Sequence, residues 1–382
     1  MIDFTLTEEQ RMIRDLARDF AQNEIAPKAK HHDVTGEFPR EICEKAFEVG
    51  LLNPSIPEEY GGAGMKALEE CLIAEELAAA CSGISTAMMV NTLATAPVLV
   101  GASDEQKRKW LTPMTQELCF AAYGVTEPGA GSDVLGIKTT AVKKGNDYVI
   151  NGQKMWISGA GVADWFFVLT YTKKEAGLRG MTAFIVPANA PGVTVGKKED
   201  NMGQRASDTR GITFEDVVVP EENRIGPEGR GWMLAMAAFD HTRPPVAAGA
   251  VGVGRAAMEH AVRYAKERHA FGVAIHRHQA VAFMIADMAK DLDAARLLVW
   301  RAATIYDQGQ KNSYEAACAK AFAADTAMRV CVDAVQIFGG YGFNKEYPVE
   351  KLMRDAKIFQ IYEGTSQIQR LIISKEAIGN VK

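Results

Sequence analysis

Hydrophobic and polar positions follow three successive patterns along the chain, and the first pattern is helical. Apolar residues recur at helical spacing between Met12 and Phe20, directly after a T-x-x-Q capping box at Thr7–Gln10. A second helix is expected to begin near Pro39, because proline is favoured at the first helical position. Further amphipathic patterns predict helices over about 68–80 and 85–100. We therefore expect an all-helical N-terminal domain.

The pattern changes near residue 121, where short segments rich in β-branched and aromatic residues begin to alternate with turns. Asn151-Gly152 follows one such segment and is a strong hairpin signal. The sequence predicts an antiparallel β domain, either a barrel or a sandwich. The expected strand segments are Tyr148–Ile150, Met155–Ile157, Trp165–Leu169, Ala183–Val186, Val193–Val195 and Ile212–Phe214.

The last third of the chain is again helical. Long amphipathic patterns cover about 245–268, 278–307 and 313–337, and such lengths are typical of a bundle of antiparallel helices. The predicted fold class is therefore α+β with several domains. The expected boundaries are 1–121 for the N-terminal all-α domain, 122–233 for the middle β domain and 234–382 for the C-terminal helical domain.

Composition narrows the function classes. The chain has 382 residues, a formal net charge of −5 and 24% charged residues, with no strongly basic block, so a general nucleic-acid surface is not expected. The six cysteines are scattered, without a C-x-x-C pair, and are expected to be reduced thiols. We expect no membrane span, and the acidic N-terminus resembles neither a signal nor a transit peptide. These features suit a bacterial cytoplasmic protein, or a mature mitochondrial-matrix protein whose leader has been removed.

The segment Ile361–Gln367 carries the most specific chemistry. It places Glu363 in a short turn beside Tyr362, and Thr365 or Ser366 is positioned to N-cap the following helix. A carboxylate held in this way is suited to act as a general base for a weakly acidic proton. The alternative is a surface glutamate that forms an ordinary salt bridge.

Two glycine-rich segments are candidates for ligand contact. Val125–Asp133 contains Gly129, Gly131 and Ser132, and glycines let the backbone approach a ligand, although a plain interdomain loop has the same composition. Phe338–Gly342 ends a long helix, where Gly339 is expected to be the C-cap.

A third glycine motif, Gly252–Ala257, matches the dinucleotide-binding fingerprint. The residues before it continue a helical pattern, whereas the fingerprint requires a preceding strand. We therefore interpret its glycines as sites of close helix packing. There is no P-loop and no G-x-S-x-G elbow, so neither a P-loop nucleotidase nor a serine hydrolase is supported.

Two arginines and two histidines are further candidates for ligand binding. Arg243 is expected at the start of a long helix, where a cation opposes the helix dipole, which favours a role in binding an anion such as phosphate. Arg268 is expected at the end of the same helix, where a cation is favourable in any case. His276 and His278 have a metal-like spacing without nearby cysteine or carboxylate ligands, so no metal site is predicted.

Together these residues resemble the acyl-CoA dehydrogenase family, and most closely its medium-chain members, over essentially the whole chain. Any one of the motifs is moderate evidence, whereas all of them in order are specific. The likeness is densest at Val125–Asp133, Met155–Ser158, Asn201–Arg205, Gln336–Gly340, Glu346–Asp355 and the Glu363 segment.

The resemblance implies an N-terminal helical domain, a middle antiparallel β-barrel and a C-terminal four-helix bundle. It implies FAD between the β domain and the bundle, partly across a subunit interface of a homotetramer that is a dimer of dimers. The implied reaction is oxidation of an acyl-CoA to the trans-2-enoyl-CoA in fatty-acid β-oxidation, with electrons passed to an electron-transfer flavoprotein. Flavin N5 would accept the hydride, because no side chain can.

By the same resemblance Glu363 is the catalytic base, and its backbone N–H and a ribityl hydroxyl of FAD polarise the thioester carbonyl. Contacts with acyl-CoA are implied for Ser132, Asp240, Arg243, Tyr362 and Gly364. Contacts with FAD are implied for Tyr123, Val125, Thr126, Gly131, Ser132, Trp156, Ile157, Ser158, Arg268, Phe271, His278, Gln279, Gln336, Ile337, Phe338, Gly339, Gly340, Thr365 and Gln367.

Three positions bear on how closely the chain follows the family. Ser158 stands where medium-chain members usually carry threonine, which keeps the hydroxyl. Ala270 stands where the family has a threonine, so one FAD contact is weakened. Some members place the base at the position of Thr242, which cannot serve here, so Glu363 is the single candidate.

Substrate choice depends on the helix expected over about 85–100, which by family likeness floors the acyl pocket. It contains Met88 and Met89, and no lysine or arginine occurs between Cys81 and Lys107, which disfavours a dicarboxylic acyl group. We expect straight acyl chains of short to medium length. The alternatives are a short- or branched-chain acyl-CoA dehydrogenase, an acyl-CoA oxidase, which usually has a longer chain, and a non-enzymatic flavin-binding relative that acts as a binding module.

Overall fold

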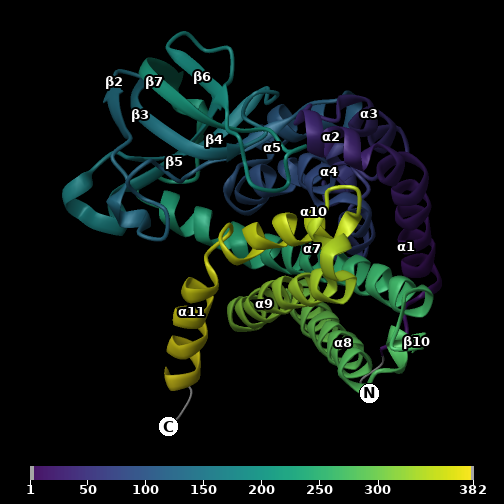
Figure 1. Cartoon of the computed structure of the whole chain (residues 1–382). Coiled ribbons are helices and arrows are strands. Elements are labelled where there is room, and N and C mark those ends of the chain that lie inside the picture. The colour runs from purple at the N-terminus through teal and green to yellow at the C-terminus, as the bar shows by residue number, and fades with distance from the viewer. Residues whose placement is uncertain (1–3, 380–382) are drawn as a thin grey trace.

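The computed structural model describes residues 4–379, and the chain forms three regions in the predicted order α, β, α (Figure 1). This arrangement confirms the predicted fold class, and we propose the domain boundaries given above. The N-terminal region contains α1 (Glu8–Phe20), α2 (Ala29–Thr35), α3 (Arg40–Glu48), α4 (Ala67–Gly101), α5 (Asp104–Leu111) and α6 (Pro113–Gln116).

The first helix begins as predicted. The Thr7 hydroxyl accepts from the Gln10 N–H at 3.1 Å, and the Gln10 side chain accepts from the Thr7 N–H at 3.1 Å, so two backbone donors at the helix start are satisfied. α3 begins at Arg40, with Pro39 as its N-cap.

The two helices predicted over 68–80 and 85–100 are parts of one element, α4. The helical backbone is interrupted only at Cys81, which has φ −164° and ψ 111°. One extended residue changes the direction of the chain and lets the two halves of α4 pack against different neighbours. By length and composition, α4 is also the one described helix that would be able to cross a membrane, and 72% of its most apolar stretch is buried inside the molecule.

The middle region is an eight-stranded sheet in the order β6-β7-β3-β2-β4-β5-β8, with β1 paired to β4. Most neighbouring strands are antiparallel, whereas β4 runs parallel to β1, with Ala121 opposite Trp165, and parallel to β2, with Thr140 opposite Tyr171. The strands are β1 (Ala121–Gly124), β2 (Thr140–Lys144), β3 (Asp147–Ser158), β4 (Trp165–Tyr171), β5 (Met181–Pro187), β6 (Val193–Lys198), β7 (Thr209–Pro220) and β8 (Arg224–Ile225).

The hairpin predicted at Asn151-Gly152 is wrong, because both residues lie inside β3 at an irregularity in its pairing with β7. The Asn151 side chain bonds across to Asp216 at 3.0 Å instead of closing a turn. Gly152 is required because a Cβ there would lie 2.4 Å from the Thr139 hydroxyl. Glycine marks a bulge and a close approach here rather than a turn.

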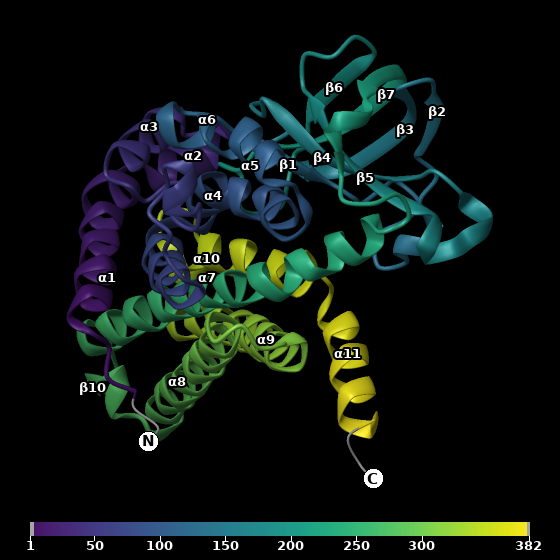
Figure 2. The same cartoon turned by 180° about the vertical axis from the view of Figure 1, so that it is seen from behind.

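The C-terminal region is built on α7, a helix of 37 residues that runs from the β domain through the whole bundle (Figure 2). The elements are α7 (Gly231–Glu267), the small hairpin β9 (His269–Ala270) and β10 (Val273–Ala274), α8 (Gln279–Asp307), α9 (Ser313–Phe338), α10 (Pro348–Ala356) and α11 (Ser366–Gly379).

The interpretation of Gly252 and Gly254 as packing residues is confirmed. Both lie inside α7, where a Cβ on Gly252 would meet the Glu75 carbonyl oxygen at 2.2 Å and one on Gly254 would meet the Leu292 side chain at 2.6 Å. In contrast, the prediction that a helix starts just after Arg243 is wrong. α7 begins at Gly231 and passes through Pro244 and Pro245, so Arg243 lies in a helix interior and the helix-dipole argument does not apply to it.

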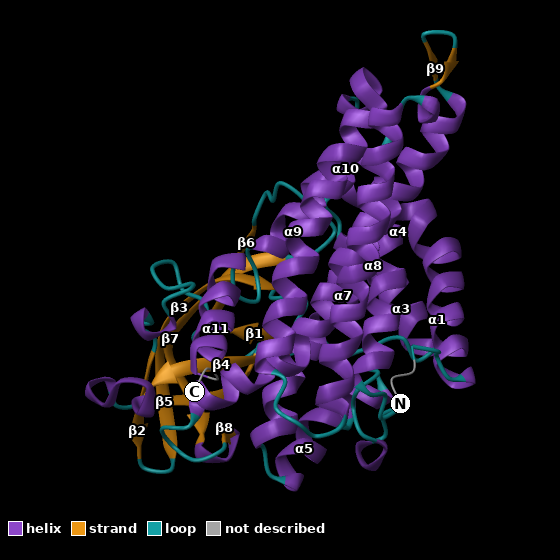
Figure 3. Cartoon of the chain, turned by 90° about the horizontal axis from the view of Figure 1, so that it is seen from below, coloured by secondary structure: helices purple, strands orange, loops and turns teal. Residues whose placement is uncertain are grey.

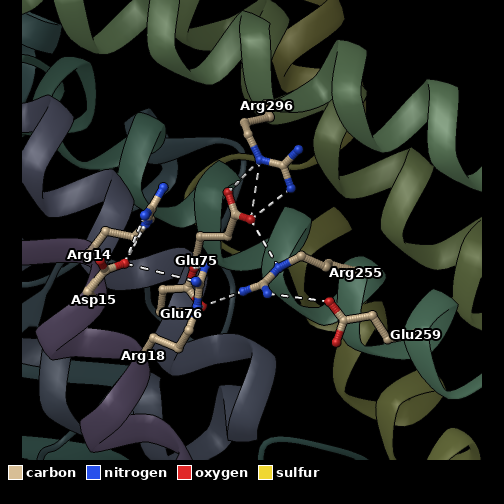
Figure 4. Close-up of polar contacts among 8 residues, drawn as sticks. All are labelled: Arg14, Asp15, Arg18, Glu75, Glu76, Arg255, Glu259 and Arg296. Carbon is tan, nitrogen blue, oxygen red and sulfur yellow. Dashed lines mark hydrogen bonds and ion pairs between the residues drawn. The ribbon is translucent and has the colours of Figure 1, made fainter. Parts of the chain in front are cut away.

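Ion pairs connect the N-terminal helices to the C-terminal bundle (Figure 4). Glu76 of α4 accepts from Arg18 of α1 at 2.7 Å and from Arg255 of α7 at 2.7 Å. The neighbouring Glu75 pairs with Arg255 at 3.1 Å and with Arg296 of α8 at 2.8 Å. Burial works to raise the pKa of Glu76, but the two arginines outweigh it and lower the pKa, so the carboxylate stays charged inside this contact.

Two parts of the C-terminal region project from the body of the molecule. The hairpin of β9 and β10 lies at the end of the long helices that is remote from the β domain (Figure 3), and Phe271 at its tip is 97% exposed. α11 extends away from the bundle (Figure 2) and exposes Leu371 and Ile378. Exposed apolar side chains of this kind are typical of surfaces that other chains cover.

Candidate active site

Glu363 lies in the turn between α10 and α11 with a strained backbone. Its φ is +51°, and the next residue, Gly364, has φ +88°. A positive φ is uncommon for a residue with a side chain and persists only where the surroundings enforce it. Thr365 caps α11 by accepting from the Ile368 N–H at 3.1 Å, which confirms one of the two predicted caps.

The Glu363 carboxylate is half-buried. Its Oε2 accepts a hydrogen bond from the Thr242 hydroxyl at 2.8 Å. Desolvation raises the pKa of Glu363, and this effect outweighs the opposing influence of Thr242, Lys320, Arg243 and His241. A carboxylate with a raised pKa is a stronger base than an exposed one.

Two side chains hold the backbone around Glu363. Lys320 of α9 donates to the carbonyl oxygens of Tyr362 at 2.7 Å and Gly364 at 2.6 Å. Gln369 of α11 donates to the carbonyl oxygens of Glu363 and Gly364, both at 3.0 Å. Within the described part of the chain the Glu363 N–H has no acceptor, so it is available to a ligand.

The residues opposite Glu363 come from the interior of α7. Pro244 cannot donate to the carbonyl of Asp240, and the Asn312 side chain fills that place at 3.0 Å. The disturbed helix turns Thr242 and Arg243 toward the same site as Glu363.

Arg243 is buried without a close counter-ion. Its nearest carboxylate oxygen, on Asp240, lies 3.6 Å away, and its Nε has no hydrogen-bond partner in the described chain. Burial lowers the pKa of Arg243, although Asp240 and Glu363 oppose the effect. A buried guanidinium with a free donor is suited to an anionic or carbonyl-bearing ligand.

The two predicted flavin-lining segments are joined by a buried ion pair. Nζ of Lys154 donates to Oε1 of Glu127 at 2.9 Å and to the Val125 carbonyl at 3.1 Å. The same carboxylate accepts from the Thr139 hydroxyl at 2.6 Å. The Met155 N–H donates to the Thr126 carbonyl at 2.9 Å. The end of β3 and the loop after β1 therefore form one surface.

This surface carries free donors and an exposed ring. The hydroxyls of Thr126, Ser132 and Ser158 have no partner among the described residues. Trp156 has φ +62° and its side chain is 56% exposed. Around Gly131 the space is open, as a Cβ there would have no neighbour within 4 Å. Ile157 and Tyr123 are buried behind the surface.

A second group of predicted FAD residues lines a cavity of about 530 Å³ at the far end of α7. The guanidinium of Arg268 lies 5.8 Å from the centre of the Tyr341 ring and has no carboxylate partner in the described chain. Gly339 caps α9, as predicted, and Gly339 and Gly340 both face open space. The predicted residues in the cavity wall are Arg268, Ile337, Phe338 and Gly340.

The other residues predicted to contact FAD lie on three helices and on the β9–β10 hairpin. The Phe271 ring is 5.8 Å from that of His278, which is followed by Gln279 at the start of α8, and Gln336 is exposed in the last turn of α9. Gln367 is exposed in the first turn of α11. The structure thus brings Glu363, Thr242, Arg243 and Asp240 together, and it separates the Trp156 surface from the Arg268 cavity.

Sequence reasoning missed the supporting residues. Lys320, Gln369, Glu127 and Lys154 are buried polar residues that touch the backbone of the predicted segments. The signal for Lys320 was available, since this lysine stands among the alanines of an otherwise apolar stretch of α9.

A half-buried carboxylate, a buried guanidinium and an unpaired backbone N–H converge on one place. Such a set is able to take a proton from carbon beside a carbonyl and to stabilise the charge that develops on the carbonyl oxygen. On a chain of three domains, α, β and α, this arrangement suits an enzyme that removes a proton from carbon next to a carbonyl.

The chain belongs to the acyl-CoA dehydrogenase family. Three family models cover it in order: the acyl-CoA dehydrogenase N-terminal domain over residues 7–117, the middle domain over 122–217 and the C-terminal domain over 229–378. The chain is 51% identical over 384 residues to a probable medium-chain specific acyl-CoA dehydrogenase 2, mitochondrial, of Caenorhabditis briggsae, covering 100% of this chain and 93% of that protein.

Solved structures show the same likeness. A chain from a study of the electron transferring flavoprotein of Acidaminococcus fermentans has a TM-score of 0.96 and 43% identity, covering 99% of this chain and 100% of that one. Butyryl-CoA dehydrogenase from Megasphaera elsdenii gives 0.96 and 40% with the same coverage. An FAD complex of PigA gives 0.94 and 29%, covering 98% and 99%. The protein is therefore an acyl-CoA dehydrogenase, an FAD-dependent oxidoreductase of fatty-acid oxidation.

Proposed function

We propose that the protein oxidises short- to medium-chain acyl-CoA to trans-2-enoyl-CoA, with Glu363 as the catalytic base. The observation that carries the proposal is the Glu363 carboxylate, bonded to Thr242 at 2.8 Å in a desolvated site that raises its pKa. The α-proton of a thioester is weakly acidic, so its removal needs a base of this kind together with stabilisation of the enolate oxygen.

Each residue of the site has a proposed part. Glu363 takes the proton from the α carbon, and its free N–H donates to the thioester carbonyl. Thr242 keeps one carboxylate oxygen in place, which leaves the other directed to the substrate. Arg243 supplies positive charge close to the developing negative charge, and Ser132, Asp240, Tyr362 and Gly364 contact the CoA thioester.

The residues present fit FAD. Free hydroxyls at Thr126, Ser132 and Ser158 and the exposed Trp156 suit a flat, polar ring system, and the Arg268 cavity suits a pyrophosphate and adenosine. Tyr123, Val125, Gly131 and Ile157 would lie at the ring, and Phe271, His278, Gln279, Gln336–Gly340, Thr365 and Gln367 along the rest of the cofactor. When bound, FAD supplies the acceptor for the β-hydride, which no side chain takes up.

The separation of these two groups supports an assembly of several chains. α7 has 37 residues and therefore runs about 55 Å, with the Trp156 surface near its start and Arg268 just after its end. One FAD cannot reach both groups within a single chain. The exposed Phe271 would then contact the cofactor of a second copy, as expected for a homotetramer that is a dimer of dimers.

Chain length is proposed from the wall of the acyl pocket. Met89 and Tyr362 both pack against the core of the C-terminal bundle, whereas Met88 is part of the N-terminal core. A methionine there closes the pocket but yields more readily than a branched side chain. Because the relatives named above include a medium-chain and a butyryl-CoA enzyme, octanoyl- and butyryl-CoA are the substrates to compare.

Electron-transfer flavoprotein is the proposed acceptor, since one similar structure comes from a study of such a protein. The proposed location is the bacterial cytoplasm, or the mitochondrial matrix if a leader has been removed.

The test is an anaerobic titration of the purified protein with octanoyl-, butyryl- and palmitoyl-CoA, in which the visible flavin band is followed. We expect bleaching with octanoyl- or butyryl-CoA and much less with palmitoyl-CoA. Glu363→Gln should bind FAD and acyl-CoA but lose about 10²- to 10⁴-fold of the reduction rate. Glu376→Gln, on the exposed part of α11, is the control. Flavin that no acyl-CoA bleaches, or an active Glu363→Gln variant, would overturn the proposal.

A further inference from the structure

Lys320 is a fully buried lysine without an ion-pair partner. Its side chain is 0% exposed, and no carboxylate in the described chain lies within salt-bridge distance of it. Its ammonium instead donates to two backbone carbonyls, those of Tyr362 at 2.7 Å and Gly364 at 2.6 Å. Burying a charge in this way is unfavourable, so proteins rarely keep one without a specific use.

The groups around Lys320 are all part of the site. Burial lowers the pKa of Lys320 to about 7, with Glu363 and Asp325 acting to raise it and Arg243 to lower it. Asp325, five residues further along α9, accepts from Gln360 at 2.7 Å and from Ser366 at 2.9 Å. Two side chains of α9 with opposite charge thus hold the segment that carries Glu363.

The contact with Tyr362 acts directly on the N–H of Glu363. The Tyr362 carbonyl and the Glu363 N–H belong to one planar peptide group, so fixing the oxygen also fixes the direction of the N–H. A cation at the carbonyl oxygen polarises the same group and makes the N–H a stronger donor. The contact with Gly364 holds the turn itself, in which Glu363 and Gly364 both have positive φ.

We propose that Lys320 is a positioning residue for the reaction, which aims and polarises the Glu363 N–H toward the thioester carbonyl and keeps the Glu363 carboxylate charged. The proposal rests on the proposed function, because it assigns a supporting group to the same base. Lys320 does not touch the substrate in this proposal. It acts through one peptide group and through its charge.

The charge of Lys320 should also affect how flavin reduction depends on pH. Lys320 faces Glu363 from α9, and three residues face it from α7: His241, Thr242 and Arg243. Lys320 is one of the groups that lower the pKa of Glu363. Without the ammonium, the base should gain its charge at higher pH. The rise of the flavin reduction rate with pH should then move to higher pH, because a nearby opposite charge that favours the carboxylate has been lost.

The experiment compares Lys320→Met with Lys198→Met in the FAD-loaded protein. Lys198 is a matched control, since its ammonium also donates to two backbone carbonyls, those of Gly36 and Arg205, away from Glu363. The probe is 2-octenoyl-CoA labelled with ¹³C at the thioester carbonyl, whose infrared stretch reports how strongly the site polarises it. Reduction by octanoyl-CoA is measured across pH with the same proteins.

We expect Lys320→Met to bind the probe but to lose most of the infrared shift, and to reduce flavin about 100-fold more slowly, the scale of a small misplacement. Lys198→Met should match the wild type in both. Lys320→Gln keeps one donor without the charge and should show an intermediate infrared shift and the same move of the pH profile.

Three results would overturn the proposal: an unchanged carbonyl frequency, an unchanged pH profile, or loss of bound flavin in both Lys320 variants, which would make the lysine a residue of bundle stability. Failure of the proposed function is separate. It would appear in the wild type, as absent bleaching by any acyl-CoA, before a variant is compared.

Discussion

Nζ of Lys154 lies 2.9 Å from Oε1 of Glu127, and this buried pair joins the end of β3 to the loop after β1. Burial lowers the pKa of Lys154 to about 8, with Glu127 opposing the effect. Burial also works to raise the pKa of Glu127, but Lys154 outweighs it, so the carboxylate remains charged. The pair holds both segments that we expect to line the flavin.

Lys154→Met should therefore cost about 3–5 kcal/mol of unfolding free energy, because it leaves Glu127 buried and unpaired. It should also lower the FAD content of the purified protein, measured from the ratio of visible to ultraviolet absorbance. Lys143→Met is the control, since Lys143 pairs with Glu221 on the exposed side of the same sheet. Equal FAD content in the two variants would contradict this role.

Thr242→Val should shift the pH dependence of flavin reduction. The Thr242 hydroxyl lowers the pKa of Glu363 by bonding to its charged form, so its removal should raise that pKa further. The rate should fall most at low pH and recover as pH rises. Thr95→Val, which removes a buried hydroxyl bonded only to its own helix, should leave the profile in place. A uniform loss at all pH values would mean that Thr242 acts by geometry alone.

Glu363→Gln should stabilise the fold at neutral pH. The pKa of Glu363 in the folded state is raised above the unfolded value of about 4.3, so the folded state binds more protons between the two values. The contribution of this residue to stability is therefore largest at low pH and is lost as pH rises through the folded pKa. Urea unfolding of both proteins across that range should show a gap that widens with pH. A constant gap would argue against desolvation of the carboxylate.

Arg243→Ala should weaken acyl-CoA binding by about 10- to 100-fold, the value of a hydrogen bond to a charged group, and slow reduction while FAD stays bound. The reason is its buried position with a free Nε beside Glu363. Isothermal titration with 2-octenoyl-CoA measures the binding. The control is Arg301→Ala, an exposed arginine of α8. Loss of flavin from the variant would mean that Arg243 contacts FAD and not acyl-CoA.

Met89→Ala should move the preference toward longer acyl chains, whereas Met88→Ala should lower stability without changing preference. The two neighbours belong to different parts of the core: Met89 packs, like Tyr362, against the core of the C-terminal bundle, whereas Met88 lies within the core of the N-terminal helices. The ratio of palmitoyl- to octanoyl-CoA reduction rates measures the effect. An equal ratio in both variants would place the end of the pocket elsewhere.

The fold and the turn that carries Glu363 could be predicted from the sequence because both depend on local patterns. The capping box at Thr7, the switch to β-branched segments near residue 121 and the Glu363 turn are each short and self-contained. The predictions that were wrong concern residue types that occur in two kinds of local structure. Asn151-Gly152 forms a bulge instead of a turn because Thr139 lies against the glycine. Pro244-Pro245 lies inside a helix because Asn312 replaces a missing donor.

The supporting residues of the site could not be predicted for a different reason. Lys320 is 43 residues before Glu363 in the sequence, as its bond to the neighbouring Gly364 carbonyl spans 44 positions. The alanines around Lys320 indicate that it is buried, but which carbonyl it reaches depends on how helices pack, and no local spacing records that. Glu127 lies within the Val125–Asp133 segment, and Lys154 directly precedes Met155. Their pairing depends on how β3 lies against the loop after β1, which the sequence does not give.

The break in α4 at Cys81 has a consequence for how the protein unfolds. Ala74, before the break, belongs to the core of the C-terminal bundle, Ile73 and Ile84 on its two sides belong to that of the N-terminal helices, and Val98 belongs to that beneath the β domain. One helix thus contributes to three hydrophobic cores, and none of them is complete when α4 is displaced. Melting should consequently proceed as a single cooperative transition of the chain, and a fragment cut at either domain boundary should fail to fold by itself.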